Sequence, residues 1–282
     1  MKVSYYPGCS LHATGREYNE SVKAVSRALG IELDELDDWS CCGASSAHST
    51  NFKLSIALPA RNIVAAEKRE WDVMVPCAAC FNRFKSAQHH LENNEALRTE
   101  IEGIIGEEYK GGVTVRNPID IIYTDIGLDR VNELVRRRLE GLKPVSYYGC
   151  LLLRPPGICN FDDYENPYML DNLMESMGAK SRSWSYKTDC CGGSLTLGKT
   201  EIVVRLIDKL MTMAREAGAN CIITACPVCF ANLDTRASKN VVLPAFYFTE
   251  MIAMALGLEG TDSWFKRHNV DPRPLLRSLG LV

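Results

Sequence analysis

Along the chain, short apolar runs rich in β-branched and aromatic residues alternate with longer segments whose apolar residues recur at helical spacing. In the first half, the pattern predicts strands over residues 3–6 and 71–75, a helix over 17–29 before Gly30, and a helix starting near Cys77. In the second half, it predicts strands over residues 145–148 and 221–224 and helices over 168–177 and 201–217. This alternation is typical of α/β lobes, which place ligand sites at strand ends and helix starts.

The cysteines indicate that the two halves are copies of one unit. Ten of the twelve cysteines form two groups, with the spacings C-x31-CC-x34-CxxC and C-x39-CC-x34-CxxC. From the adjacent pair onward, the second group follows the first at a constant offset of 149 residues. The groups are Cys9, Cys41, Cys42, Cys77 and Cys80, and then Cys150, Cys190, Cys191, Cys226 and Cys229. We therefore expect two pseudo-symmetric, Rossmann-like α/β lobes, residues 1–143 and 144–282, each with one CCG motif.

Composition and charge narrow the class of protein. Hydrophobic residues make up 46% of the chain, charged residues 24%, and the formal net charge is −3. These values are typical of a globular protein and argue against a dominant nucleic-acid-binding surface. The N-terminal residues lack the apolar core of a signal peptide, so we expect a cytoplasmic protein. The apolar stretch 241–258 contains Pro244 and Glu250, which favour a buried or amphipathic helix over a transmembrane segment.

In a cytoplasmic chain of this size, so many cysteines indicate metal or redox chemistry rather than disulfide staples. The CxxC pairs lie where helices are expected to begin, and backbone amides there favour an anionic group. Gly43, Gly192 and Gly193 allow further amides to approach sulfur closely. Five thiols exceed the four of a structural zinc site or an ordinary [4Fe–4S] cubane, and an adjacent pair can reach two metals of one cluster. The pattern favours an unusual iron–sulfur site, with two four-thiolate zinc sites as the alternative.

Other polar residues are weaker candidates for a functional role. His12 and His48 follow Cys9 and Cys42 and titrate near neutrality, so either could donate a proton to a product thiolate, although a solvated histidine is the simpler interpretation. Arg154 and Lys199 could attract an anionic substrate group, or they are ordinary surface charges. Cys221 is interpreted as a small buried hydrophobe, and Cys159 lies in a loop with no assigned role.

The residues around the cysteines resemble a known family. Tyr6-Pro7-Gly8-Cys9 matches Tyr147-Tyr148-Gly149-Cys150, Ser40-Cys41-Cys42-Gly43 matches Asp189-Cys190-Cys191-Gly192, and Cys77-Ala78-Ala79-Cys80-Phe81 matches Cys226-Pro227-Val228-Cys229-Phe230. The doubled framework resembles the cysteine-rich CCG domain, and in particular the B-type subunit of heterodisulfide reductase. The run from Tyr147 to Pro156 and the run from Trp184 to Gly192 are similar to that subunit.

The resemblance implies a cofactor, partners and a reaction. It implies that each five-cysteine group binds one noncubane [4Fe–4S] cluster, and that a disulfide such as the coenzyme M–coenzyme B heterodisulfide is cleaved between the two clusters. It also implies a ferredoxin-like C-type subunit that brings electrons and a flavin-containing A-type subunit that feeds it. The chain itself has no flavin or nicotinamide fingerprint and no ferredoxin-type cysteine run, so electrons must come from another protein.

The identity of the substrate stays open at this point, because no residue in the sequence is specific for one disulfide. Related complexes act in methanogenesis or in sulfur metabolism. Two other functional classes also stay open. The chain could be an electron-transfer subunit of a quinone-linked or sulfur-oxidising oxidoreductase, or a zinc-stabilised scaffold without a redox role.

Overall fold

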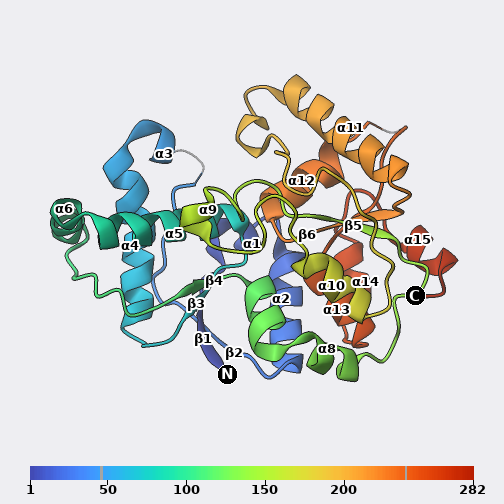
Figure 1. The fold of residues 1–282 in the computed structure, drawn as a ribbon, viewed down its shortest axis with the longest axis horizontal. Coiled ribbons are helices and arrows are strands. Elements are labelled where there is room, and N and C mark those ends of the chain that lie inside the picture. The colour runs from blue at the N-terminus through green and yellow to red at the C-terminus, as the bar shows by residue number, and fades with distance from the viewer. Residues whose placement is uncertain (45–46, 239) are drawn as a thin grey trace.

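The computed structural model describes residues 1–44, 47–238 and 240–282, and it contains two parallel β-sheets surrounded by helices (Figure 1). The first sheet has the order β2-β1-β3-β4, with β1 at Lys2–Tyr5, β2 at Glu32–Glu35, β3 at Val73–Met74 and β4 at Val115–Arg116. The second has the order β5-β6-β7, with β5 at Pro144–Tyr147, β6 at Cys221–Thr224 and β7 at Ala245–Tyr247. The predicted α/β fold with two similar lobes is therefore confirmed.

The sheets bring the cysteine motifs to common edges. All pairs are parallel, with Ser4 opposite Val73 in the first sheet and Tyr147 opposite Thr224 in the second. Every residue of β5, β6 and β7 is buried, as expected for parallel strands that are covered on both faces. Because the carboxyl ends of parallel strands meet at one edge, the chain after β1 and after β3 emerges close together, and so does the chain after β5 and after β6.

The first half contains helices α1 to α8. They span Gly8–His12 (α1), Arg16–Ala28 (α2), Ala47–Thr50 (α3), Phe52–Glu67 (α4), Ala78–Asn93 (α5), Glu95–Ile105 (α6), Pro118–Asp120 (α7) with the helical segment η1 at Ile121–Ile126, and Leu128–Leu134 (α8). The apolar face of α2, with Tyr18, Val22 and Val25, is fully buried, as its periodicity predicts. Asn51 and Asn94 cap α4 and α6 by accepting backbone amide hydrogen bonds.

The second half contains the remaining helices. They span Pro156–Cys159 (α9), Met169–Ser176 (α10), Gly193–Leu195 (the short turn η2), Thr200–Glu216 (α11), Pro227–Arg236 (α12), Phe248–Ala255 (α13), Thr261–Phe265 (α14) and Arg273–Ser278 (α15). Helices α10 and α11 lie where the sequence predicts helices, with ends that shift by one residue, and α12 begins at the second CxxC motif, where a helix start was expected.

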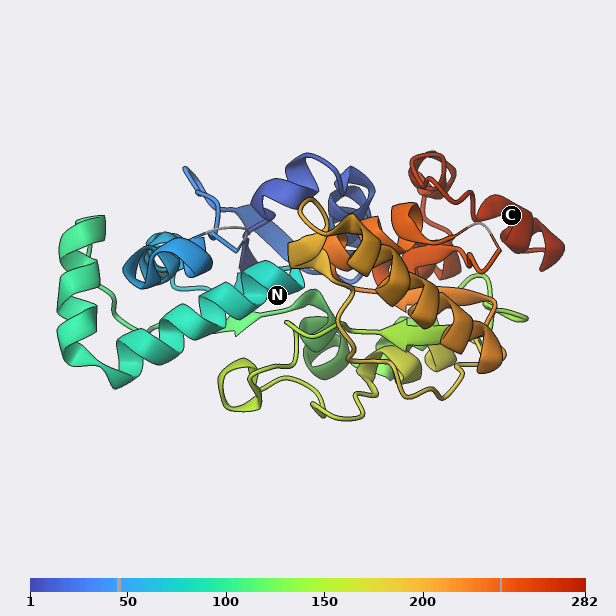
Figure 2. The same ribbon diagram turned by 90° about the horizontal axis from the view of Figure 1, so that it is seen from above.

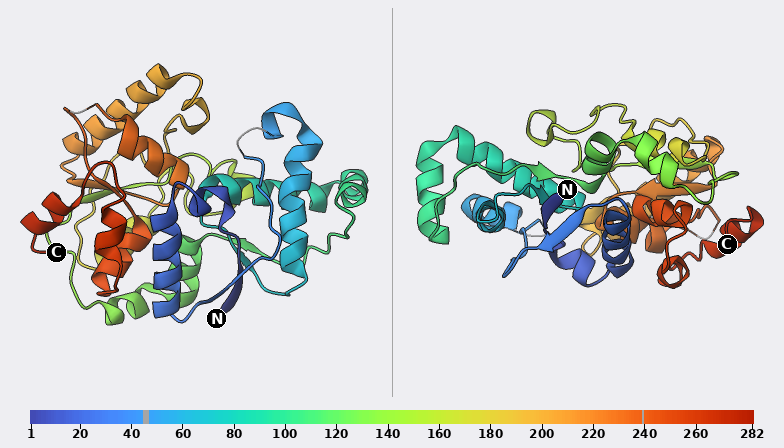
Figure 3. Two further views of the ribbon diagram at one scale, coloured as in Figure 1. Left: turned by 180° about the vertical axis from the view of Figure 1, so that it is seen from behind. Right: turned by 90° about the horizontal axis from the view of Figure 1, so that it is seen from below.

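The two lobes exchange helix contacts in a symmetric way. Helix α2 of the first half packs against α13 and α14 of the second half, and α10 of the second half packs against α7 and α8 of the first. Figure 1 shows α2 beside α13 and α14, and the two views of Figure 3 show the same neighbours from behind and from below. The proposed boundary at residue 143 stays a prediction, but helices of each half pack against helices of the other.

One feature breaks the symmetry. The chain from Cys80 to Val115 is about twice as long as the chain from Cys229 to Ala245, because α5 is longer than α12 and α6 has no counterpart. Figure 2 shows α5 and α6 extending to the end of the molecule that lies farthest from the second sheet.

Residues 241–258 do not form the single helix that we expected. Pro244 interrupts the segment, residues 245–247 pair with β6, and only the following residues form α13. Every residue of α13 is buried, so the apolar run serves the protein core. In the described part of the chain, no helix is long and apolar enough to cross a membrane.

Candidate metal centre

The ten predicted cysteines lie in two groups that meet between the lobes. The sulfur atoms of Cys42 and Cys80 are 3.1 Å apart in the first group, and Cys191 and Cys229 are in contact in the second. The first cysteine of each CxxC motif reaches the other group, because Cys77 and Cys226 are in side-chain contact across the two lobes. The two cysteine groups therefore meet where the thiols of Cys77 and Cys226 lie close enough to interact.

The ten cysteines of the two groups differ in their exposure to solvent. Cys9, Cys41 and Cys190 are exposed and Cys150 is half-buried, while the other six members of the two groups are buried. Cys150 contacts Cys190, and Cys9 lies near enough to Cys41 to raise its pKa, after the larger effects of Cys42 and of burial. Each group thus has a solvent-facing end and a buried end, and the buried ends touch.

The residue before each adjacent cysteine pair is held by the same kind of hydrogen bond in both lobes. The hydroxyl of Tyr6 donates to the carbonyl of Ser40 at 2.9 Å, and the hydroxyl of Tyr147 donates to the carbonyl of Asp189 at 2.7 Å. Both carbonyls belong to the residue immediately before a cysteine pair. These buried tyrosines therefore hold each cysteine pair close to the end of β1 or β5.

The glycine of each CCG motif has a backbone reason to be glycine. Gly43 and Gly192 both have φ of +75°, and a Cβ atom at Gly43 would lie 2.8 Å from the side chains of Ala47 and Leu58. The amide of Gly43 lies 3.4 Å from the sulfur of Cys41, and the amide of Gly192 lies 3.3 Å from the sulfur of Cys190. The expected close approach of glycine amides to sulfur is thereby confirmed.

A second pair of glycines lies against the CxxC sulfurs. Gly8 and Gly149 have φ of +69° and +67°, and Cβ atoms placed there would lie 3.3 Å from the sulfur of Cys80 and 2.9 Å from that of Cys229. A side chain at either position would therefore press on a cysteine of its own group. These glycines let the start of α1, and the corresponding turn after β5, lie directly against the cysteines.

Two residues that the sequence patterns did not single out tie the groups together. The hydroxyl of Tyr18 donates to the carbonyl of Ala225 at 3.0 Å and to that of Pro76 at 3.4 Å, and these residues immediately precede Cys226 and Cys77. The amide of Asn82 donates to the carbonyls of Leu151 and Arg154 at 3.1 and 2.8 Å, and to the sulfur of Cys159 at 3.3 Å. Helical periodicity places Tyr18 on the buried face of α2, but it carries no signal for a bond to the other lobe.

Contacts between neighbouring thiols set their acidity. Contact with Cys41, and then with Cys80, lowers the pKa of Cys42 to about 3 in spite of its burial. Contact with Cys150 lowers the pKa of Cys190 to about 6, and the amides of Gly192 and Gly193 contribute to this shift. The proton-donating partners Cys41 and Cys150 have raised pKa values for the converse reason. Each group thus has a thiolate available near neutral pH, which is the form that binds metals.

Thiols are side chains that bind metal groups, but the cysteines as placed here do not form a complete metal site. Among the described residues, no three cysteine, histidine or acidic side chains are arranged to hold a metal ion. The sulfurs of Cys42 and Cys80 meet at 3.1 Å, and two thiolates at that distance would repel one another, so they must separate to bind a metal group. The iron–sulfur interpretation therefore depends on the number of thiols, their place at helix starts and their amide neighbours.

The histidine candidates do not contact a cysteine among the described residues. His12 ends α1, and its Nε2 atom lies 3.1 Å from Glu35 Oε1 while its ring packs edge-on against Trp39. His48 lies exposed on α3 and its Nε2 atom is 3.4 Å from the hydroxyl of Ser49. A role for either as a proton donor stays a prediction.

The remaining predicted residues fall into two kinds. Arg154 donates to the hydroxyl of Thr188 at 3.1 Å and keeps 43% of its side chain exposed, whereas Lys199 is exposed at the start of α11. Cys221 is fully buried in β6, as predicted, and burial raises its pKa. Cys159, for which the sequence indicated no role, is fully buried beside α5.

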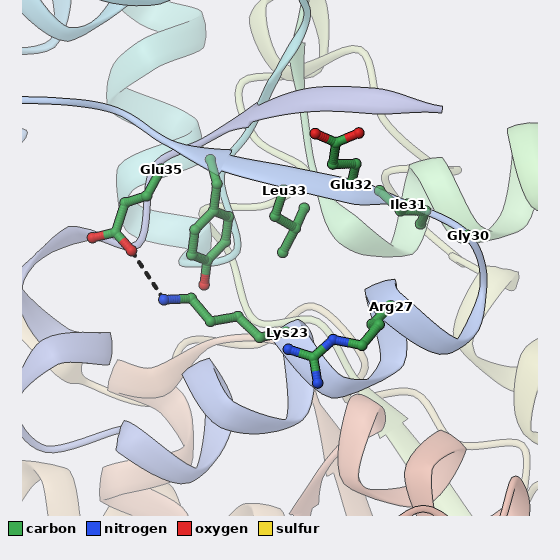
Figure 4. Close-up of a pocket in the computed structure, with 8 residues that line it drawn as sticks. Lys23, Arg27, Gly30, Ile31, Glu32, Leu33 and Glu35 are labelled. Carbon is green, nitrogen blue, oxygen red and sulfur yellow. Dashed lines mark hydrogen bonds and ion pairs between the residues drawn. The ribbon is translucent and has the colours of Figure 1, made fainter.

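A large surface cavity lies elsewhere. It has a volume of about 560 Å³ and lies between α2 and the edge strand β2, with Lys23, Arg27 and Glu35 among its lining residues (Figure 4). Figure 4 shows Lys23 reaching across to Glu35, which it pairs with at 2.9 Å. None of the described residues that line it is a cysteine, so this cavity is not the cysteine site.

Known proteins resemble the chain over nearly its whole length. It is 24% identical over 284 residues to the 8-methylmenaquinol:fumarate reductase membrane anchor subunit of Wolinella succinogenes, and the match covers 97% of this chain and 99% of that protein. It is 28% identical over 269 residues to the B-type subunit of the ferredoxin/F(420)H(2)-dependent CoB-CoM heterodisulfide reductase of Methanosarcina acetivorans, and this match covers 91% of this chain and 89% of that protein.

A solved structure and a family match complete the comparison. A hypothetical protein from Helicobacter pylori has the same fold, with a TM-score of 0.72 at 12% identity over 95% of this chain, and the chain spans about half of that longer protein, 51%. The cysteine-rich CCG domain matches residues 3–85 and 145–234, more than half of the chain, and each match includes one complete group of five cysteines. The chain therefore belongs to the cysteine-rich CCG domain family and contains two copies of that domain.

Proposed function

We propose that this chain is the iron–sulfur catalytic subunit of a heterodisulfide reductase-like complex, which cleaves a disulfide or forms it in the reverse direction. In this proposal each group of five cysteines binds one noncubane [4Fe–4S] cluster. The observation that carries the proposal is the contact between Cys77 and Cys226, which joins the two groups at one place between the lobes. Two separate electron carriers would not need to meet in this way.

The reaction needs two electrons and two protons for each disulfide, and it yields two thiols. When bound, the two clusters supply one-electron steps, so two clusters side by side match the two electrons of one disulfide bond. The solvent-facing ends of the groups, at Cys9, Cys41, Cys150 and Cys190, are where a substrate can approach. Arg154, held by Thr188 but partly exposed, is placed in the segment after Cys150 to attract an anionic substrate group.

The proposal includes partner proteins. The relative from Methanosarcina acetivorans is named as the B-type subunit of a reductase that depends on ferredoxin or F(420)H(2). By this likeness, a ferredoxin-like C-type subunit would bring electrons to this chain and a flavin-containing A-type subunit would feed that partner. The cytoplasmic location that the sequence favours stays a prediction.

A second candidate function is that of an electron-transfer subunit in a complex whose substrate chemistry takes place elsewhere. It is favoured by the Wolinella succinogenes relative, which matches 97% of this chain and whose name specifies fumarate reduction with a quinol, not a disulfide. The two candidates differ in whether this chain itself acts on a disulfide.

Metal and sulfide analysis of protein purified without oxygen tests the cofactor first. We expect about eight irons and about eight acid-labile sulfides per chain. About two zinc ions without sulfide would instead support four-thiolate zinc sites and a scaffold role. Cys191→Ser should lower the iron content by up to half, whereas Cys221→Ala, which removes a buried cysteine outside both groups, should leave it unchanged.

Turnover distinguishes the two candidate functions. The loaded chain, given a reduced one-electron dye and a panel of disulfides, should release two thiols for every two electrons consumed. Iron-loaded chain that passes electrons to a quinone-linked partner but reduces no disulfide supports the second candidate. A stable mixed disulfide between substrate and Cys42 or Cys191, with both clusters spectroscopically intact, would point to thiol–disulfide exchange at the cysteine pairs instead.

A further inference from the structure

A cluster of buried titratable groups lies behind the second cysteine group. It consists of Glu17 on α2, Glu250 on α13 and His268 after α14, and we call it the acid–histidine cluster. The side chains of Glu250 and His268 are fully buried, and His268 Nε2 lies 2.9 Å from Glu250 Oε1. Glu17 is 4% exposed and lies close enough to Glu250 and His268 for its own pKa to depend on them.

Helix capping explains only part of this arrangement. Glu250 Oε2 accepts the backbone amide of Tyr247 at 2.9 Å, which caps the start of α13. Capping requires neither a buried histidine on the other oxygen nor a second buried carboxylate nearby. The Nδ1 atom of His268 is also buried without a hydrogen-bond partner among the described residues. Such groups are costly to bury, which favours a function for the cluster.

Aromatic rings connect the cluster to the second cysteine group. Phe230 directly follows Cys229, and its ring centroid lies 4.8 Å from that of His268 and 4.2 Å from that of Tyr247. Tyr247 stacks on Tyr18 at 4.2 Å, and the Tyr18 hydroxyl bonds the carbonyl before Cys226. Aromatic side chains of Phe230, Tyr247 and Tyr18 therefore lie between the cluster and the segments that carry Cys226 and Cys229.

The cluster has an excess of negative charge. Burial raises the pKa of Glu17, and the nearby Glu250 carboxylate adds to this. Burial alone would lower the pKa of His268, but Glu250, Asp234 and Glu17 together raise it. The other charged groups facing it are Asp234 on α12, whose carboxylate accepts two backbone amides, and Arg267, which pairs with Glu20 near the surface. The cluster has two carboxyl groups for one imidazole, so a proton can be taken up on Glu17 or on His268.

The first lobe has a different arrangement at the same place. The third residue of the helix after the last strand is Asp120 in the first lobe and Glu250 in the second. Asp120 pairs with Arg116, which also pairs with Asp125 at 3.1 Å and stays a cation at every physiological pH. Among the described residues, only the second lobe therefore places a titratable histidine in this position.

We propose that the acid–histidine cluster takes up one proton when the redox group held by the second cysteine group is reduced. The electron comes from a one-electron donor and stays on that group, and the proton comes from solvent and stays on Glu17 or His268, so the buried charge does not change. An added negative charge in a low-dielectric interior raises the proton affinity of neighbouring groups, and aromatic side chains cannot screen it. This inference rests on the proposed iron–sulfur function. In this proposal Glu17 and His268 balance the charge of the reduced group and do not contact the substrate.

Redox titration of the full chain loaded with iron and sulfide tests the inference, with EPR distinguishing the two clusters between pH 6 and 8.5. One proton per electron makes each tenfold change in proton concentration worth about 59 mV, so one cluster should show about that slope per pH unit and the other a smaller one. His268→Gln and Glu17→Gln should flatten the slope, and proton uptake in weak buffer should fall from about one per chain. The control His89→Gln, on the exposed part of α5, should change neither.

The outcomes separate the two proposals. Two redox-active clusters whose potentials do not depend on pH would overturn this inference and leave the proposed function intact. An unchanged slope in Glu17→Gln and His268→Gln would also overturn it, since some other group would then take up the proton. Protein that binds no redox-active iron would overturn both. If His268→Gln does not fold, Glu17→Gln decides alone, because it preserves the Glu250–His268 pair.

Discussion

Substituting Gly149 by alanine isolates one close contact at the second cysteine group. Gly149 has φ of +67°, and the added Cβ atom would lie 2.9 Å from the sulfur of Cys229. Gly30 provides a matched control, since its φ is +75° and no atom lies within 4 Å of the Cβ position. Both substitutions place a side chain in the left-handed region, at a cost of about 1–2 kcal/mol. Only Gly149→Ala also overpacks a buried site, which adds roughly 1–3 kcal/mol.

The free energy of unfolding should therefore fall by about 1–2 kcal/mol in Gly30→Ala and by about 2–5 kcal/mol in Gly149→Ala. Gly8→Ala should be intermediate, because its Cβ atom would lie 3.3 Å from the sulfur of Cys80. Urea unfolding of the metal-free protein under reducing conditions measures these values. Iron content after reconstitution provides a second measure, and it should fall for Gly149→Ala but not for Gly30→Ala. Equal losses of stability in the two variants, with full iron content in both, would refute the steric interpretation.

Three further changes test contacts within and between the lobes. Tyr18→Phe removes a hydroxyl shared by the two CxxC segments and should cost about 0.5–1.5 kcal/mol in urea unfolding; no loss would mean that these hydrogen bonds contribute nothing. Asn82→Ala leaves two partly buried carbonyls without their donor and should cost about 1 kcal/mol, with faster proteolysis of the loop after Cys150 as the local signature. Because the folded pKa of His268 is raised, its charge contributes to stability fully below about pH 6.5, and this contribution is lost as the pH rises through the folded value. The stability difference between wild type and His268→Gln should therefore narrow as the pH rises, and a constant difference would contradict the buried ion pair.

Local patterns in the sequence predicted most of the elements that place the cysteines. The apolar face of α2, the buried run of β6 and the glycines that end helices are properties of short segments, so they can be read without knowledge of the other lobe. The constant spacing after the adjacent cysteines also reflects the repeated fold directly. The error over residues 241–258 arose because an apolar run has no clear period when strand and helix are both fully buried.

The contacts between lobes could not be predicted in this way. The bond from Tyr18 to Ala225 joins residues 207 positions apart, and the contact of Cys77 with Cys226 depends on how the two halves pack. The pairing of Glu250 with His268 likewise needs the path of the chain after α14. Periodicity reports which face of a helix is buried, but not which partner covers it.

The exchange of helices between the halves has a consequence for how the protein is made. Ser21 on α2 bonds Thr249 on α13 through their hydroxyls at 2.7 Å, so the first half lacks the cover for α2 until the last quarter of the chain has left the ribosome. Domains that fold during synthesis usually complete their core before the next domain is made. The first half cannot do so, because α13 is needed to cover α2. Both cysteine groups consequently acquire their final surroundings only after α13 has been synthesised and has packed against α2.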